Sequence, residues 1–75
     1  MSKLITSLNL GDDQIQIFEG RTLTFEKCAV VSFQEQDGWG VTMNISPDHV
    51  DTFLSTPSMQ TSFLAFAKEK LGVAA

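Results

Sequence analysis

The sequence predicts an α+β fold in which a four-stranded antiparallel β-meander is followed by two C-terminal helices that pack on one face of the sheet, in the order ββββαα. Apolar and polar residues alternate through much of the first 45 residues, which is the period of a half-buried strand. The period then becomes helical, and the pairs Ser46-Pro47 and Thr56-Pro57 mark two helix starts. Helices that follow a complete antiparallel sheet pack on one of its faces.

The predicted strands span about 3–10, 14–18, 22–35 and 39–45. The turn "GDDQ" separates the first two, and a register with Leu10 opposite Ile15 keeps apolar residues together across it. A loop at "EGR" then sets Ile17 opposite Leu23. The third strand would be much longer than usual, so a bend or bulge is expected near residues 26–28, where the alternation is broken.

The odd numbering of the apolar residues determines the length of the turn between the third and fourth strands. A two-residue loop of Asp37 and Gly38 would pair odd with even residues and so would set an apolar face against a polar one. A three-residue loop over 36–38 instead places Val31 opposite Met43 and keeps the apolar side chains on one face. This type of loop ends in a left-handed residue, and Gly38 occupies that position.

The predicted helices span about 47–54 and 57–71. Ser46 is a suitable N-cap and Pro47 suits the first helical position, while Gly72 suits the residue just past the second helix. The predicted core combines the apolar faces of the later strands and both helices. It consists of Phe25, Val31, Phe33, Val41, Met43, Ile45, Phe53, Phe63 and Phe66.

Composition favours one compact domain over residues 1–75 that is not a nucleic-acid-binding protein. Hydrophobic residues make up 43% of the chain, which is enough for a core. The net charge is −4 and the five basic residues are scattered, so direct contact with nucleic acid is not expected. The N-terminal segment lacks a sustained apolar run, so no membrane anchor is expected, and the single cysteine suits a reducing, cytoplasmic location.

His49 and Cys28 are the residues with most chemical potential. His49 stands among polar neighbours at a helix start, but residues one or two apart on a helix do not face each other, so a solvated side chain is the favoured interpretation. Cys28 follows a cation that could activate its thiol, yet a lone cysteine in a strand more often fills apolar space. The sequence has no motif for a metal or cofactor, and no catalytic residue is predicted.

A partner-binding surface is the remaining candidate. Its predicted residues are Trp39, Asp37, Glu35, Thr42 and Asn44. Trp39 lies beside a turn on the core-facing parity, so it is either a core-edge residue or an anchor in an interface. The acidic residues of the turns form either a solvated surface or a negative surface for a basic partner. The fourth strand carries no charge and lies at an edge, where a C2 homodimer could form.

Two functional hypotheses follow from the sequence. The leading one is a small cytosolic, non-enzymatic protein-binding module that works through its surface. One concrete form would be an inhibitor of a host protein, encoded by a phage or a mobile element. The alternative is a small enzyme or ligand-binding subunit in which His49 and Cys28 act together. The sequence identifies no particular protein partner for either.

Overall fold

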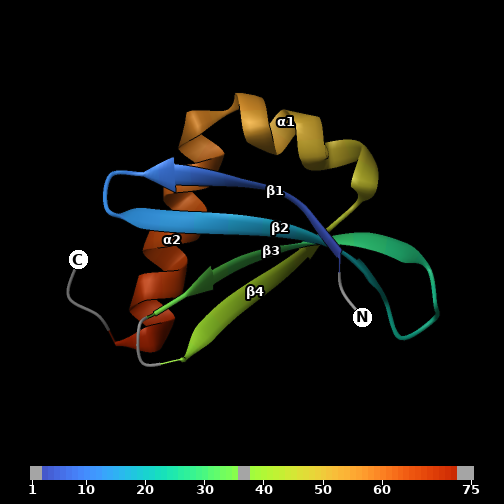
Figure 1. Cartoon of the computed structure of the whole chain (residues 1–75), viewed down its shortest axis with the longest axis horizontal. Helices are drawn as coiled ribbons and strands as arrows, with labels where there is room; N and C mark the ends of the chain where they lie inside the picture. The colour runs from blue at the N-terminus through green and yellow to red at the C-terminus, as the bar shows by residue number, and fades with distance from the viewer. Residues whose placement is uncertain (1–2, 36–37, 73–75) are drawn as a thin grey trace.

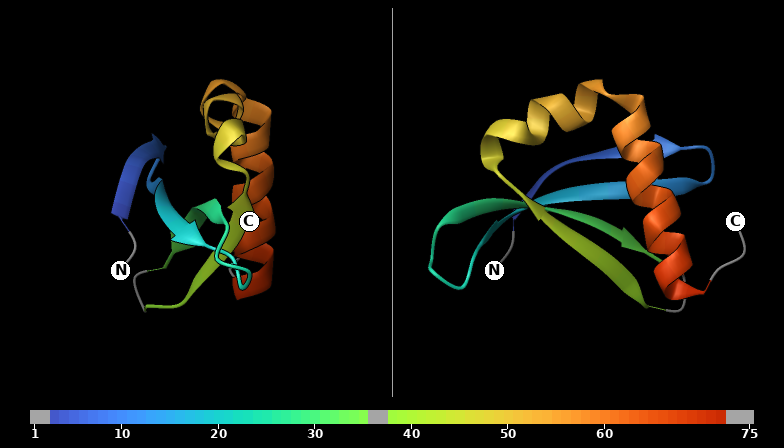
Figure 2. Two further views of the ribbon diagram at one scale, coloured as in Figure 1. Left: turned by 90° about the vertical axis from the view of Figure 1, so that its right-hand side faces the viewer. Right: turned by 180° about the vertical axis from the view of Figure 1, so that it is seen from behind.

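The computed structural model describes residues 3–35 and 38–72 and has the predicted ββββαα architecture (Figure 1). Its elements are β1 (Lys3–Leu10), β2 (Asp13–Arg21), β3 (Lys27–Gln34), β4 (Gly40–Ile45), the 3-10 helix η1 (Pro47–His49), α1 (Val50–Ser55) and α2 (Pro57–Leu71). The strands form one antiparallel sheet in the order β1-β2-β3-β4, so β1 and β4 are its edges. Both helices lie on the same face of this sheet (Figure 2).

The register predicted for the hairpin of β3 and β4 is confirmed. Val31 lies opposite Met43 and Phe33 lies opposite Val41, so the apolar side chains share the face under the helices. Gly38 has a φ of 94°, which is the left-handed conformation that the three-residue loop requires. The first two loop residues, 36 and 37, lie outside the described residues.

The register predicted for β1 and β2 is wrong by two residues. Leu8, not Leu10, lies opposite Ile15, and the strands are joined by a two-residue turn at 11–12. A shift of two leaves every side chain on its original face, so parity cannot distinguish the two registers. β1 also contains a bulge between Leu4 and Thr6 that the sequence pattern does not reveal.

The expected turn between β2 and β3 is also wrong. β2 continues to Arg21 and β3 begins only at Lys27, so Ile17 lies opposite Val31 rather than opposite Leu23. The first five residues of the predicted third strand, 22–26, are therefore not part of a strand. A hairpin loop over residues 23–25 replaces the expected bend. This loop projects from one end of the sheet, away from α2 (Figure 2).

The helices begin and end close to the predicted residues. The Ser46 Oγ accepts a hydrogen bond from the backbone N–H of Asp48 at 3.4 Å, and the first turn is 3-10 rather than α. The Thr56 side chain makes no capping hydrogen bond, although Thr56 does occupy the N-cap position of α2. Gly72 ends α2 with a φ of 73° and donates its N–H to the carbonyl oxygen of Glu69.

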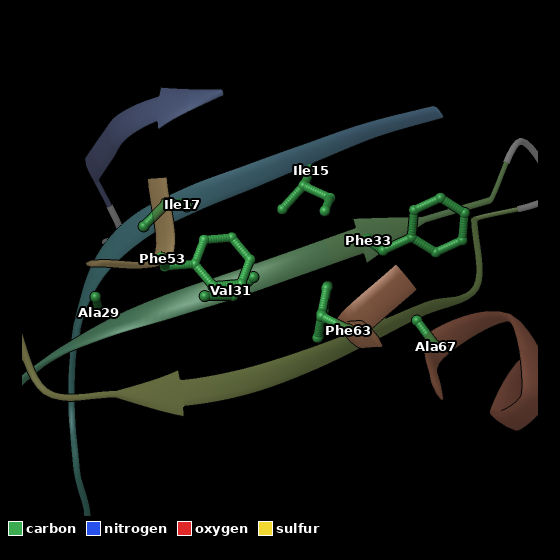
Figure 3. Packing of buried hydrophobic residues seen from close by; sticks show 8 residues of the cluster. All are labelled: Ile15, Ile17, Ala29, Val31, Phe33, Phe53, Phe63 and Ala67. Carbon is green, nitrogen blue, oxygen red and sulfur yellow. The ribbon is translucent and has the colours of Figure 1, made fainter. Parts of the chain in front are cut away.

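The core lies between the helices and the two central strands (Figure 3). The rings of Phe53 on α1 and Phe63 on α2 pack edge to face, with their centroids 6.4 Å apart and their planes at 77°. The cluster consists of Ile15, Ile17, Ala29, Val31, Phe33, Phe53, Phe63 and Ala67. Four predicted core residues are thus confirmed as buried, and the predicted Val41, Met43 and Ile45 are partly buried against the cluster.

Two predicted core residues, Phe25 and Phe66, are exposed instead. Phe25 is 79% exposed because it lies in the loop between β2 and β3. Phe66 is 47% exposed because the buried side of α2 runs through Gln60, Phe63 and Ala67, a rotation of the helix that leaves Phe66 toward solvent.

Gln60 sets this rotation and joins the two helices. Its side chain is 8% exposed, and its Nε2 donates to the carbonyl oxygens of Phe53 at 2.9 Å and Leu54 at 3.1 Å. These carbonyls belong to the last turn of α1, where the helical ladder ends, and the carbonyl of Phe53 also accepts the N–H of Thr56 at 3.4 Å. Gln60 therefore ends α1 and holds the start of α2 against the core.

We predict that Gly38→Val lowers the free energy of unfolding by about 1–2 kcal/mol, because a β-branched residue is strained at positive φ. A Cβ at this position would meet no atom within 4 Å, so the loss reflects backbone conformation alone. Gly38→Asn, which tolerates the left-handed region better, is the matched control. Urea denaturation that shows equal losses for both variants would contradict this interpretation.

Phe63→Ala is expected to cost about 3–5 kcal/mol, because it removes a buried ring that contacts both helices and the sheet. Phe66→Ala is the matched control on the same helix, and its half-exposed ring should cost about 1 kcal/mol or less. Denaturation of both variants with a common baseline measures the difference. Similar losses at the two positions would show that the buried side of α2 is assigned incorrectly.

Candidate functional site

The outer edge of β4 presents backbone groups that have no partner strand. The carbonyl of Trp39 accepts a hydrogen bond from the N–H of Glu35 at 2.7 Å, so the backbone groups of Trp39 point toward β3. The direction of the N–H and C=O groups alternates along an antiparallel strand, so the backbone groups of every second residue after Trp39 also point toward β3. The N–H and C=O groups of Gly40, Thr42 and Asn44 therefore point away from the sheet.

The β4 edge has none of the features that usually prevent pairing with another strand. Such features include charged residues, proline and bulges. β4 contains no charged residue and no proline, and its pairing with β3 runs from Gly40 to Ile45 without a shift. The opposite edge, β1, has both Lys3 and a bulge after Leu4. Of the two edges, β4 is the one open to strand addition.

A shallow apolar groove lies between β4 and α2, on the helix side of the sheet. The groove is lined by the partly buried Met43, the exposed Met59 and Phe66, and the core rings of Phe53 and Phe63. Met59 is 38% exposed and Phe66 is 47% exposed. Because side chains alternate along a strand, a strand added to β4 would direct every second side chain toward this side. The groove could therefore accept apolar side chains of a strand that pairs with the β4 edge.

Trp39 lies in the hairpin at the start of β4, and its side chain is 72% exposed. Of its two predicted interpretations, the core-edge residue is contradicted by this exposure. Beside it, the Nε2 of Gln34 donates to the carbonyl of Gly38 at 3.1 Å. Glu35 is half-buried in the same hairpin, whereas Asp37 lies outside the described residues.

The acidic residues near this hairpin are partly neutralised within the chain. Asp12, Asp13 and Glu35 line an open polar depression at this end of the sheet. The Oδ2 of Asp13 accepts a hydrogen bond from the Nζ of Lys68 at 2.7 Å, in a pair whose side chains are 27% and 26% exposed. This ion pair ties β2 to α2 and removes one of the carboxylates from a surface for a basic partner.

The structure does not bring His49 and Cys28 into a catalytic arrangement. His49 is exposed at the end of η1, whereas Cys28 is 7% exposed on β3 beside Gly20. No hydrogen bond joins the two side chains, and Cys28 fills space in the way expected of a small apolar residue. Within residues 3–35 and 38–72, no cluster of His, Cys, Asp or Glu side chains could hold a metal ion.

No protein-family model, curated protein or solved structure matches this chain. None of the described helices has the length and apolar character that a membrane crossing needs.

The structure adds one element to the predicted partner surface. Thr42 and Asn44 were predicted from the edge position of β4, and their backbones do point outward. The groove does not follow from the sequence, because the predicted core places Phe66 on the buried side of α2. Gln60 gives no signal of this rotation in the sequence, because a polar side chain is usually placed on the solvent side of a helix.

Proposed function

We propose that this chain is a non-enzymatic protein-binding module whose interface is the outer edge of β4 together with the groove beside it. The observation that carries the proposal is an uncharged, unbulged strand edge that adjoins exposed apolar side chains. In strand addition, backbone hydrogen bonds supply affinity and pockets for alternate side chains supply specificity. The β4 edge offers the backbone hydrogen-bonding groups, and the groove offers the pocket.

The favoured partner segment is an extended strand with alternating apolar residues. Its backbone would pair with Gly40, Thr42 and Asn44, and its apolar side chains would lie against Met59 and Phe66. Trp39, exposed at one end of β4, would contact the segment as it leaves the sheet. Tryptophan is enriched among the residues that dominate binding energy.

A second copy of the chain is expected to use the same edge when no other partner is present. Antiparallel pairing about a two-fold axis at Thr42 places Thr42 opposite its own copy and Val41 opposite Met43. Because β4 has no charge, this pairing brings no like charges together, although each chain carries a net charge of −4. The homodimer would therefore compete with strand addition.

The free thiol of Cys28 fits a protein of the reducing cytosol, which is the location we propose. An inhibitor of a host protein, encoded by a phage or a mobile element, is one form such a module could take. The alternative, an enzyme or ligand-binding subunit based on His49 and Cys28, has less support because one side chain is exposed and the other buried.

We predict that Thr42→Pro abolishes binding without unfolding the chain. The N–H of Thr42 points out of the sheet, so proline removes a group that only a partner strand would use. Thr42→Val keeps the N–H and should still bind. Met43→Pro, whose N–H faces β3, should instead lose about 1–3 kcal/mol of stability, because a ladder hydrogen bond is broken.

Light scattering at micromolar concentration and co-purification of the tagged chain from its source cells give the two readouts. Thr42→Pro should give an 8.2 kDa monomer and lose at least tenfold of the captured partner. His49→Ala and Cys28→Ala should leave both readouts unchanged. If Thr42→Pro still binds its partner, the edge is not the interface, and if the histidine and cysteine variants lose function while folded, the enzyme hypothesis is favoured.

A further inference from the structure

The loop between β2 and β3 places a phenylalanine where its hairpin type normally requires glycine. The N–H of Thr22 donates to the carbonyl of Glu26, and the N–H of Phe25 donates to the carbonyl of Thr22, each at 2.9 Å. The hairpin of β3 and β4 repeats this pattern, with Gly38 in the place of Phe25. Phe25 has a φ of 64°, the positive sign that bulky residues rarely adopt.

Packing within the chain does not account for this conformation. Phe25 is 79% exposed and Leu23, two residues earlier, is 100% exposed. Hydrogen bonds define the loop backbone, because the Thr22 Oγ1 accepts from the N–H groups of Thr24 and Glu26. The Nη1 of Arg21 also donates to the carbonyl of Phe25, at 3.1 Å. The chain therefore presents two apolar side chains to solvent from a loop whose backbone is hydrogen-bonded.

The base of the loop also holds a pair of like charges that destabilises the isolated chain. Arg21 and Lys27 lie directly opposite each other across β2 and β3, and like charges in such a pair are destabilising. Glu19 and Glu26 are the carboxylates nearest in sequence, but neither forms an ion pair within 4 Å with a described residue. A carboxylate supplied by a partner would relieve this repulsion.

We propose that the loop is a second docking surface, in which Leu23 and Phe25 enter an apolar pocket of a partner protein whose rim carries acidic residues that meet Arg21 and Lys27. The loop lies beyond the Ile45 end of β4, at the end of the sheet opposite the start of that strand (Figure 1). Half-exposed Leu4 and Ile5 and the partly buried Phe18 continue the apolar character onto the adjoining strands.

A protein pocket fits these features better than a lipid surface does. The net charge of −4 opposes approach to an anionic bilayer, and the loop exposes two large apolar side chains, Leu23 and Phe25. A hairpin whose backbone is held by its own hydrogen bonds and that presents two apolar side chains matches a concave site, because little backbone freedom is lost on binding.

The first test uses a photoreactive residue in the cells that normally express the chain. p-Benzoylphenylalanine replaces Leu23, and the matched control places it at Ala65, which is exposed on α2. The expected result is one protein crosslinked from position 23 only, at a segment with apolar residues and carboxylates. The crosslink should persist in Thr42→Pro, so failure of the proposed β4 interface would not remove it.

The second test measures stability and affinity with the purified partner. Phe25→Gly should keep or raise the denaturation midpoint, because glycine accepts positive φ, while it weakens binding by about tenfold or more. Leu23→Ser should leave the midpoint unchanged and weaken binding similarly. Arg21→Gln with Lys27→Gln should weaken binding most at low salt.

Several outcomes would overturn the proposal. They are a lower midpoint for Phe25→Gly, unchanged binding by either loop variant, and no crosslink specific to position 23. A crosslink to another copy of this chain would assign the loop to self-assembly instead. Co-sedimentation with phosphatidylserine vesicles that depends on Phe25 would assign it to a lipid surface.

Discussion

The edge-to-face contact between Phe53 and Phe63 holds both helices on the sheet, and the rest of the structure depends on it. α1 has six residues, and an isolated helix of that length is not stable in water. Its order comes from Phe53, which is fully buried against the central strands, and from the two hydrogen bonds of Gln60 to its last turn. Since Gln60 and Phe63 are on the same helix, the contact that anchors α1 also fixes the rotation of α2. That rotation exposes Phe66 and so creates the groove beside β4.

The sequence was sufficient for the fold wherever only one register kept the apolar residues together. This was true of β3 and β4, because a two-residue loop would have put Val31 and Met43 on opposite faces. It was not true of β1 and β2, since registers that differ by two residues leave the same faces apolar. The late start of β3 could not be predicted, for a related reason. Leu23 and Phe25 continue the alternation of β3, so pattern alone extends the strand through them, although the backbone turns there.

The candidate site could be predicted only in part. The order of a meander makes its fourth strand an edge, and the register then determines which backbone groups point outward. The groove could not be predicted in this way, because it depends on how far α2 is rotated about its axis. A polar residue such as Gln60 is usually placed on the solvent side of a helix, and only its bonds to the end of α1 explain why it is buried. The exposed loop likewise contradicts the preference of its hairpin type for glycine, and such local contradictions are expected at functional positions.

The energetics of a small chain make the exposed apolar residues informative. A chain of 75 residues is typically stable by about 4–11 kcal/mol, and burial of one large apolar side chain contributes about 1.5–3 kcal/mol. Leu23, Phe25 and Trp39 are each more than two-thirds exposed, and the left-handed backbone at Phe25 costs about 1–2 kcal/mol more. Burial of these side chains in an interface would therefore contribute a free energy comparable to the stability of the whole chain. A partner that buries one of the two surfaces stabilises the folded chain by mass action, about 2.7 kcal/mol at a concentration of 100 Kd. Binding at the β4 edge and at the Leu23 loop would therefore strengthen a fold whose own core, limited to eight residues, is small.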